Sequence, residues 1–305
     1  MKRKVIQIAN STQLISLPRE WAKKNGIMKG QELDVEEEKG AITIRPFTTN
    51  TAKKAELDIS QIGEMTAQCI KSLYTQGVDE LKVTFSKPES LKIVQDTLSK
   101  DVAGFEILEQ GPSYCIIKSV SGSTDEFEPV LKRTFLLLLS MADEFLSTLN
   151  KGDYEYLSNV AHMEQTNNRF TMILRRHMNK NGRTGYEKTG PLYSVIEFLE
   201  NISDHYKHSC RYLNRNFNRK LKLRKEAIEL VSESNHMIKA FYELFYNYDE
   251  KKLAELKQTR NTLNKKSLEL LKSSLNSGEV MLIHHSLSIT QQVFSMTGQY
   301  LTIRL

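Results

Sequence analysis

Six long segments with helical periodicity make up the second half of the chain, and this feature restricts the fold more than any other. In the first segment, apolar side chains recur at the spacing of a helix that buries one side: Leu131, Phe135, Leu138, Ala142, Phe145 and Leu149. The other five segments cover residues 153–179, 191–218, 222–248, 250–275 and 279–303. Residues 124–305 are therefore predicted to form an all-α domain of two three-helix bundles, 124–220 and 221–305.

Strand patterns fill the first 121 residues. Residues 53–121 alternate short extended runs with two helical segments, 61–76 and 88–101, which predicts a small α/β module. Its isolated glycines do not form a phosphate-binding loop. With residues 1–50 as a separate β domain, the predicted fold is a multi-domain α+β chain.

The N-terminal segment reads as strand, short helix and hairpin. Pro18 stands where a helix tolerates a missing N–H, and Gly26 follows as a natural helix end. Fewer than about 50 residues can hardly bury a core alone. We therefore expect a homodimer through residues 1–46, with a core shared between two chains: Leu14, Leu17, Trp21, Ile27, Leu33, Val35 and Ile42.

Composition excludes several classes of protein. No apolar run approaches the roughly 20 residues of a membrane span, and the start lacks the apolar region of a signal peptide, so no membrane insertion and a cytoplasmic location are expected. Three scattered cysteines, without zinc-ligand spacing, are expected to be reduced thiols. No nucleophile with an oriented base can be assigned, so we expect no enzymatic activity and no organic cofactor.

The net charge of +6 has one local concentration of basic residues. Residues 1–51 carry nine basic and six acidic side chains. The basic ones include a cluster that would suit an anionic partner: Lys2, Arg3, Lys4, Arg19, Lys23 and Lys24.

Acidic residues gather on the third helical segment. Glu197, Glu200, Asp204 and His208 follow one another at spacings of three and four, which puts them on one helix face. Glu164 interrupts the apolar stripe of the preceding helix. Two interpretations remain open. These side chains could hold a metal ion such as iron, manganese or magnesium, or be neutralised by Lys207 or by an arginine among positions 169, 175, 176, 211 and 215.

The stretch "IANSTQLISLPREWAKKNGIMKGQELDV" with "AITI" resembles the AbrB/MazE-type (SpoVT-AbrB) swapped-hairpin domain over residues 2–46. The resemblance rests on the Ser-Thr turn, the "ISLP" strand, the "WA" helix and the turn that follows it. It implies that two chains exchange hairpins and bind DNA through basic side chains.

"FLENISDHYKHSCRYL" at 198–213 resembles a helix of PhoU proteins, with Glu200 and Asp204 at its paired acids. "HMEQTNNRFTMILRR" resembles the preceding helix of PhoU-like proteins, and the domain order resembles archaeal phosphate-uptake regulators. The resemblance implies regulation of phosphate transport, and metal binding on these acids. The second repeat lacks the acid pair, and His284 and His285 are expected at the surface.

Two functions follow as expectations. The first is a DNA-binding transcriptional regulator of phosphate homeostasis whose helical domain senses or relays phosphate status. The alternative is an adaptor that contacts a phosphate transporter or sensor protein, in which the N-terminal segment only dimerises the chain.

Overall fold

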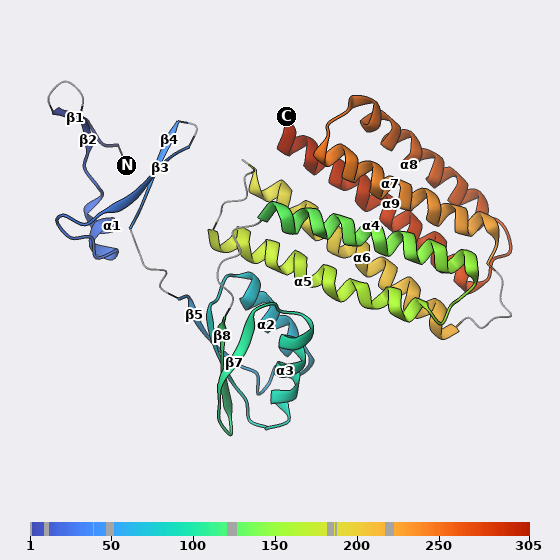
Figure 1. Cartoon of the computed structure of the whole chain (residues 1–305), viewed down its shortest axis with the longest axis horizontal. Helices are drawn as coiled ribbons and strands as arrows, with labels where there is room; N and C mark the ends of the chain where they lie inside the picture. The colour runs from blue at the N-terminus through green and yellow to red at the C-terminus, as the bar shows by residue number, and fades with distance from the viewer. Residues whose placement is uncertain are drawn as a thin grey trace. The chain divides into compact units, whose positions relative to one another are not determined.

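A computed structural model describes residues 2–8, 12–38, 40–46, 52–120, 127–181, 186, 188–216 and 223–305 (Figure 1). The chain divides into two compact units, Met1–Ala52 (unit 1) and Lys53–Leu305 (unit 2), and each is described by itself. The boundaries predicted at 121–124 and at 220–221 lie outside the described residues.

Unit 1 contains two antiparallel strand pairs and one short helix, as the sequence predicts. Its elements are β1 (Val5–Ile8), β2 (Thr12–Ile15), α1 (Arg19–Lys24), β3 (Leu33–Glu38) and β4 (Ala41–Pro46). β1 pairs with β2, and β3 pairs with β4. Pro18 directly precedes α1, and Gly26 follows it with φ +62°, a conformation that favours glycine.

The apolar side chains of unit 1 are not buried within it. In the β3–β4 hairpin, Val35 lies opposite Ile44, and Ile42 lies two residues along on the same face. Val35 is 63% exposed and Ile42 is 68% exposed. None of the described side chains of unit 1 belongs to a buried hydrophobic core.

Residues 53–120, here called the α/β module, form a four-stranded sheet with the order β5-β6-β8-β7. The elements are β5 (Lys54–Asp58), α2 (Thr66–Thr75), β6 (Glu80–Thr84), α3 (Ser90–Lys100), β7 (Phe105–Gln110) and β8 (Tyr114–Ser119). β5 and β6 are parallel, because α2 crosses over between them, whereas the other pairs are antiparallel. Side chains of both helices and of the sheet share one core, which includes Ile70, Val94, Leu81 and Ile117.

The described residues from 127 to 305 form six helices, here called the helical domain (Figure 1). They are α4 (Phe127–Lys151), α5 (Leu157–Asn181), α6 (Thr189–Asn216), α7 (Lys225–Tyr246), α8 (Glu250–Leu271) and α9 (Ser277–Arg304). α5 was expected from residue 153 but begins at Leu157, since a turn occupies the residues between. No helix among the described residues combines the length and apolar character that crossing a bilayer requires.

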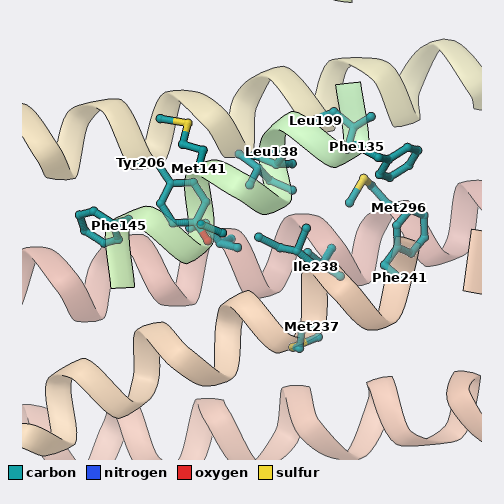
Figure 2. Packing of buried hydrophobic residues seen from close by; sticks show 14 of the residues in the cluster. Phe135, Leu138, Met141, Phe145, Leu199, Tyr206, Met237, Ile238, Phe241 and Met296 are labelled. Atoms are coloured by element: carbon teal, nitrogen blue, oxygen red, sulfur yellow. The ribbon is translucent and has the colours of Figure 1, made fainter. Parts of the chain in front are cut away.

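The two sets of three helices share one hydrophobic core. Phe135 on α4 stacks near Phe241 on α7, with ring centroids 6.2 Å apart (Figure 2). The Tyr206 hydroxyl on α6 donates to Asn235 Oδ1 on α7 at 2.5 Å, and Asn235 Nδ2 donates to the Ala142 carbonyl on α4 at 2.7 Å. Buried polar groups with partners of this kind fix the relative positions of the helices.

Arg176 on α5 attaches the α/β module to the helical domain. Its Nη1 donates to the carbonyls of Tyr74 and Val78, each at 2.7 Å, and its Nη2 donates to Asp79 at 2.8 Å. The guanidinium lies 4.7 Å from the centre of the Tyr74 ring. Met172, one turn earlier on α5, packs into the core of the α/β module.

Candidate nucleic-acid interface and acidic cluster

The six basic side chains of the predicted nucleic-acid interface form two groups in unit 1. Lys2, Arg3 and Lys4 directly precede β1, whereas Arg19, Lys23 and Lys24 lie on α1. All six are exposed, and no salt bridge among the described residues involves them. Cations without an internal partner can pair with a polyanion without first breaking a salt bridge. Contact of these residues with DNA stays a prediction.

The acidic cluster comprises Glu164 on α5 and Glu197, Glu200 and Asp204 on α6. Arg175 on α5 lies between two of the acids, because its Nη1 is 2.5 Å from Glu197 Oε1 and its Nη2 is 2.8 Å from Glu200 Oε2. Helix α5 therefore supplies a single arginine that binds both carboxylates with separate nitrogens.

Lys207 neutralises the other two acids. Its Nζ lies 2.9 Å from Glu164 Oε1 and also contacts Asp204 on the same helix. Glu164 is 3% exposed, as its place on the apolar stripe predicts. Asn167, the second polar residue on that stripe, is fully buried, and its Nδ2 lies 3.4 Å from the Leu199 carbonyl.

Burial and neighbouring charges change the pKa values in this cluster. Burial raises the pKa of Glu200 against the opposing charge of Arg175, and Glu197 and Asp204 raise it further. Burial likewise raises the pKa of Glu164 despite its bond to Lys207. Burial alone would lower the pKa of Lys207, but its hydrogen bonds to Asp204 and Glu164 outweigh this effect and raise it. Lys207 therefore stays charged beside the acids it neutralises.

In this structure the four acids of the cluster are held in ion pairs. Arg175 and Lys207 each bind one oxygen of two acids, and His208 is exposed. Within the described ranges, no group of three or more His, Cys, Asp or Glu side chains converges as metal ligands. The ion-pair alternative thus describes what the structure contains, and a metal on Glu164, Glu197, Glu200, Asp204 and His208 stays a prediction.

Histidines connect the two helical repeats at a point that the sequence did not reveal. His205 Nδ1 on α6 lies 2.8 Å from His285 Nδ1 on α9, and Gln292 Nε2 lies 2.9 Å from His205 Nε2. The expectation of a surface pair holds for His284 but is wrong for His285, which is 8% exposed. Burial lowers the pKa of His285 to about 3, and nearby histidines contribute, so its ring is neutral at pH 7.

The Arg176–Asp79 contact was also absent from the sequence-based predictions. The two residues are 97 positions apart, and no short motif relates them. The available signal was that Arg176 follows Met172 at a helical spacing of four, close to the apolar stripe of α5.

Comparison with known proteins finds similarity both in sequence and in structure. Residues 6–51 match the family described as antidote-toxin recognition MazE, bacterial antitoxin, so the N-terminal segment is MazE-like as predicted. No curated protein matches the chain. The chain is also similar to the crystal structure of the phosphate transport system regulatory protein PhoU from Streptococcus pneumoniae, with a TM-score of 0.46 and 13% identity. That similarity covers 59% of this chain and 93% of the other.

Proposed function

We propose that this chain is a DNA-binding transcriptional regulator of phosphate uptake, acting as a homodimer through unit 1, and that it is a binding protein and not an enzyme. One observation carries the DNA-binding part. Three exposed cations lie in the MazE-like segment and three directly before it, and none of the six forms a salt bridge with another described residue. A dimer presents this set twice, which doubles the number of phosphate contacts.

The exposed apolar residues of unit 1 support the homodimer. Eight large hydrophobic side chains there remain exposed in the single chain: Val5, Ile6, Ile8, Leu14, Ile15, Met28, Val35 and Ile42. Apolar exposure on this scale in about 50 residues is typical of a surface that a partner covers. A second copy of the same segment provides a self-complementary partner.

The link to phosphate rests on sequence resemblance. Residues 198–213 resemble a PhoU helix, and Glu200 and Asp204 occupy its acidic positions. The helical domain would then relay phosphate status to unit 1. It could receive this information through contact with a phosphate transporter or sensor protein.

A salt-dependent gel shift tests DNA binding. The full chain is mixed with the DNA upstream of its own gene, and we expect retention that falls steeply between 50 and 200 mM salt, as counterion release requires. The variant Lys4→Ala/Arg19→Ala should lose the shift. A matched control, Lys265→Ala/Lys272→Ala, removes two exposed charges from the helical domain and should bind like the wild type.

The same experiment separates the regulator from the adaptor. An adaptor that uses unit 1 only to dimerise would show no salt-sensitive retention, and both double variants would behave alike. Equal binding of the two variants would also exclude this surface as the DNA contact.

A further inference from the structure

A polar cavity of about 590 Å³ lies between the α/β module and the first helices of the helical domain. Its walls come from α2, the end of α3, α5 and α6, together with Lys53 at the start of unit 2. The volume lies within the range of about 300 to 1,000 Å³ that is typical of small-molecule sites.

Two lysines supply positive charge in this cavity. Lys71 on α2 is half-buried, and no carboxylate among the described residues pairs with it. Among the described residues, the one hydrogen-bond acceptor for Lys53 Nζ is the Gln76 carbonyl, at 3.2 Å. Arg175 also lines the cavity, but Glu197 and Glu200 already bind its guanidinium. The lining holds three basic side chains, Lys53, Lys71 and Arg175, against two acidic ones, Asp101 and Glu200.

Neutral polar groups line the rest of the cavity. Asn168 on α5 donates from Nδ2 to Glu164, but its Oδ1 is buried without a hydrogen-bond partner in the described structure. Tyr193 and Asn179 add further hydrogen-bonding groups. Hydroxyl groups on a ligand can bond with these two side chains.

We propose that this cavity binds a small organic anion that carries hydroxyl groups, in the chemical class of nucleotides, sugar phosphates and hydroxycarboxylates. The anionic group meets Lys53 and Lys71, and the hydroxyl groups bond with Tyr193 and Asn179. Because lysine binds phosphate and carboxylate alike as a point charge, the shared chemistry is an anion with hydroxyl donors.

The cavity adjoins the point where unit 2 begins. The backbone N–H of Lys53 donates to Asp79 Oδ2 at 3.0 Å, and the other oxygen of Asp79 accepts from Arg176 and Lys180. A ligand held by Lys53 therefore acts on the residue that directly follows unit 1 in the chain. That the ligand changes DNA affinity rests on the proposed function, whereas binding in the cavity does not.

Isothermal titration calorimetry, in which candidate ligands are added to the full chain, tests the site. The probes are AMP, glucose 6-phosphate and citrate, with adenosine, glucose and inorganic phosphate as comparisons. We expect at least one organic anion to bind while adenosine and glucose do not. Lys71→Gln should weaken that binding at least tenfold and Lys53→Gln should weaken it as well, whereas Lys92→Gln, an exposed lysine on α3, should leave it unchanged.

Each outcome decides one part of the proposal. No binding of any organic anion, equal effects of Lys71→Gln and Lys92→Gln, or equal binding of inorganic phosphate alone would overturn the site as described. If AMP and glucose 6-phosphate bind and citrate does not, the anion is a phosphate, and the reverse result assigns a carboxylate. A bound ligand without any change in the gel shift overturns only the coupling, and a failure of DNA binding in both states overturns only the proposed function.

Discussion

Unit 1 and unit 2 differ in how far their large apolar side chains are buried. Eight large hydrophobic side chains are exposed among the described residues up to Ala52, against eleven in the almost fivefold longer unit 2. In the helical domain Phe135, Leu138 and Phe241 are fully buried, whereas Trp21, the single tryptophan of the chain, is only half-buried in unit 1.

This difference has a thermodynamic meaning. A helical domain with a closed core can be stable at any concentration of the chain. Unit 1 exposes the residues that would make its core, so we expect its stability to come from association and to depend on protein concentration. The comparison therefore separates a part with its own buried core from a part that we expect to need a second copy.

The largest expected effect comes from placing charge on the exposed apolar face of unit 1. Val35→Lys/Ile42→Lys should remove about 3 to 6 kcal/mol of apolar burial from the dimer interface. We expect sedimentation velocity to show a dimer for the wild type and a monomer for the variant.

Leu268→Lys provides the matched control, since Leu268 is a similarly exposed hydrophobic residue on α8 in unit 2. It should leave the dimer intact. A wild-type chain that sediments as a monomer at micromolar concentration, or a fragment 1–52 that is folded and monomeric, would refute self-association through unit 1.

Phe241→Ala tests the opposite side of the comparison. Phe241 is fully buried and packs near Phe135, Phe245 and Tyr300. Removing its ring leaves a cavity and should lower the free energy of unfolding of unit 2 by about 3 to 5 kcal/mol. Denaturant unfolding followed by circular dichroism measures this value, and sedimentation should still report a dimer. A loss below about 1 kcal/mol would mean that the core around Phe135 is loosely packed.

Arg176→Ala should have a smaller effect, because it acts on one contact inside unit 2. The buried guanidinium satisfies two carbonyls and Asp79, and its loss leaves Asp79 with Lys180 and the Lys53 N–H as partners. We expect a loss of about 2 to 3 kcal/mol. If the α/β module is released by protease faster from the variant than from the wild type, the contact between this module and α5 is the one that the substitution weakens. Arg169→Ala, an exposed arginine on the same helix, is the control, and equal proteolysis of the two variants would contradict the role of Arg176.

Local patterns in the sequence predicted the elements well. The apolar seam from Leu131 to Leu149 recurs as the buried face of α4, and the six helical segments correspond to six helices. The first helix of the α/β module was expected from residue 61 but begins at Thr66, because a 3₁₀ turn at Gly63–Met65 precedes it. A 3₁₀ turn and an α-helix share the same local composition, so the pattern alone does not separate them.

Contacts between residues far apart in the chain could not be predicted from local sequence patterns. Glu164 was correctly expected to face the core, but spacing offered five arginines as partners for the acids, and only the packing of α5 on α6 selects Arg175. Lys207 was among the alternatives because it lies three residues from Asp204. The partnership of Arg176 with Asp79 depends on how the α/β module packs on α5, which no local pattern encodes.

The smallest expected effect is on how the stability of unit 2 depends on pH, and it comes from the single carboxyl group of Asp79. Burial would raise the pKa of Asp79, but hydrogen bonds from Lys180 and the Lys53 N–H, with the charges of Lys180 and Arg176, outweigh it and hold the pKa below its ordinary value of 3.8. A carboxyl whose pKa is lower in the folded state stabilises the fold fully above that ordinary value, and this stabilisation is lost as the pH falls through the folded pKa.

We expect Asp79→Asn to lower the free energy of unfolding of unit 2 by about 1 to 2 kcal/mol at pH 7. The difference in unfolding free energy between wild type and variant should shrink steadily below pH 4. Asp96→Asn, which changes an exposed carboxylate on α3, should leave the pH dependence as in the wild type. A difference in unfolding free energy between wild type and Asp79→Asn that stayed constant from pH 7 to pH 2 would contradict this prediction. It would mean that the charge of the Asp79 carboxylate does not stabilise its contacts with Lys53, Arg176 and Lys180.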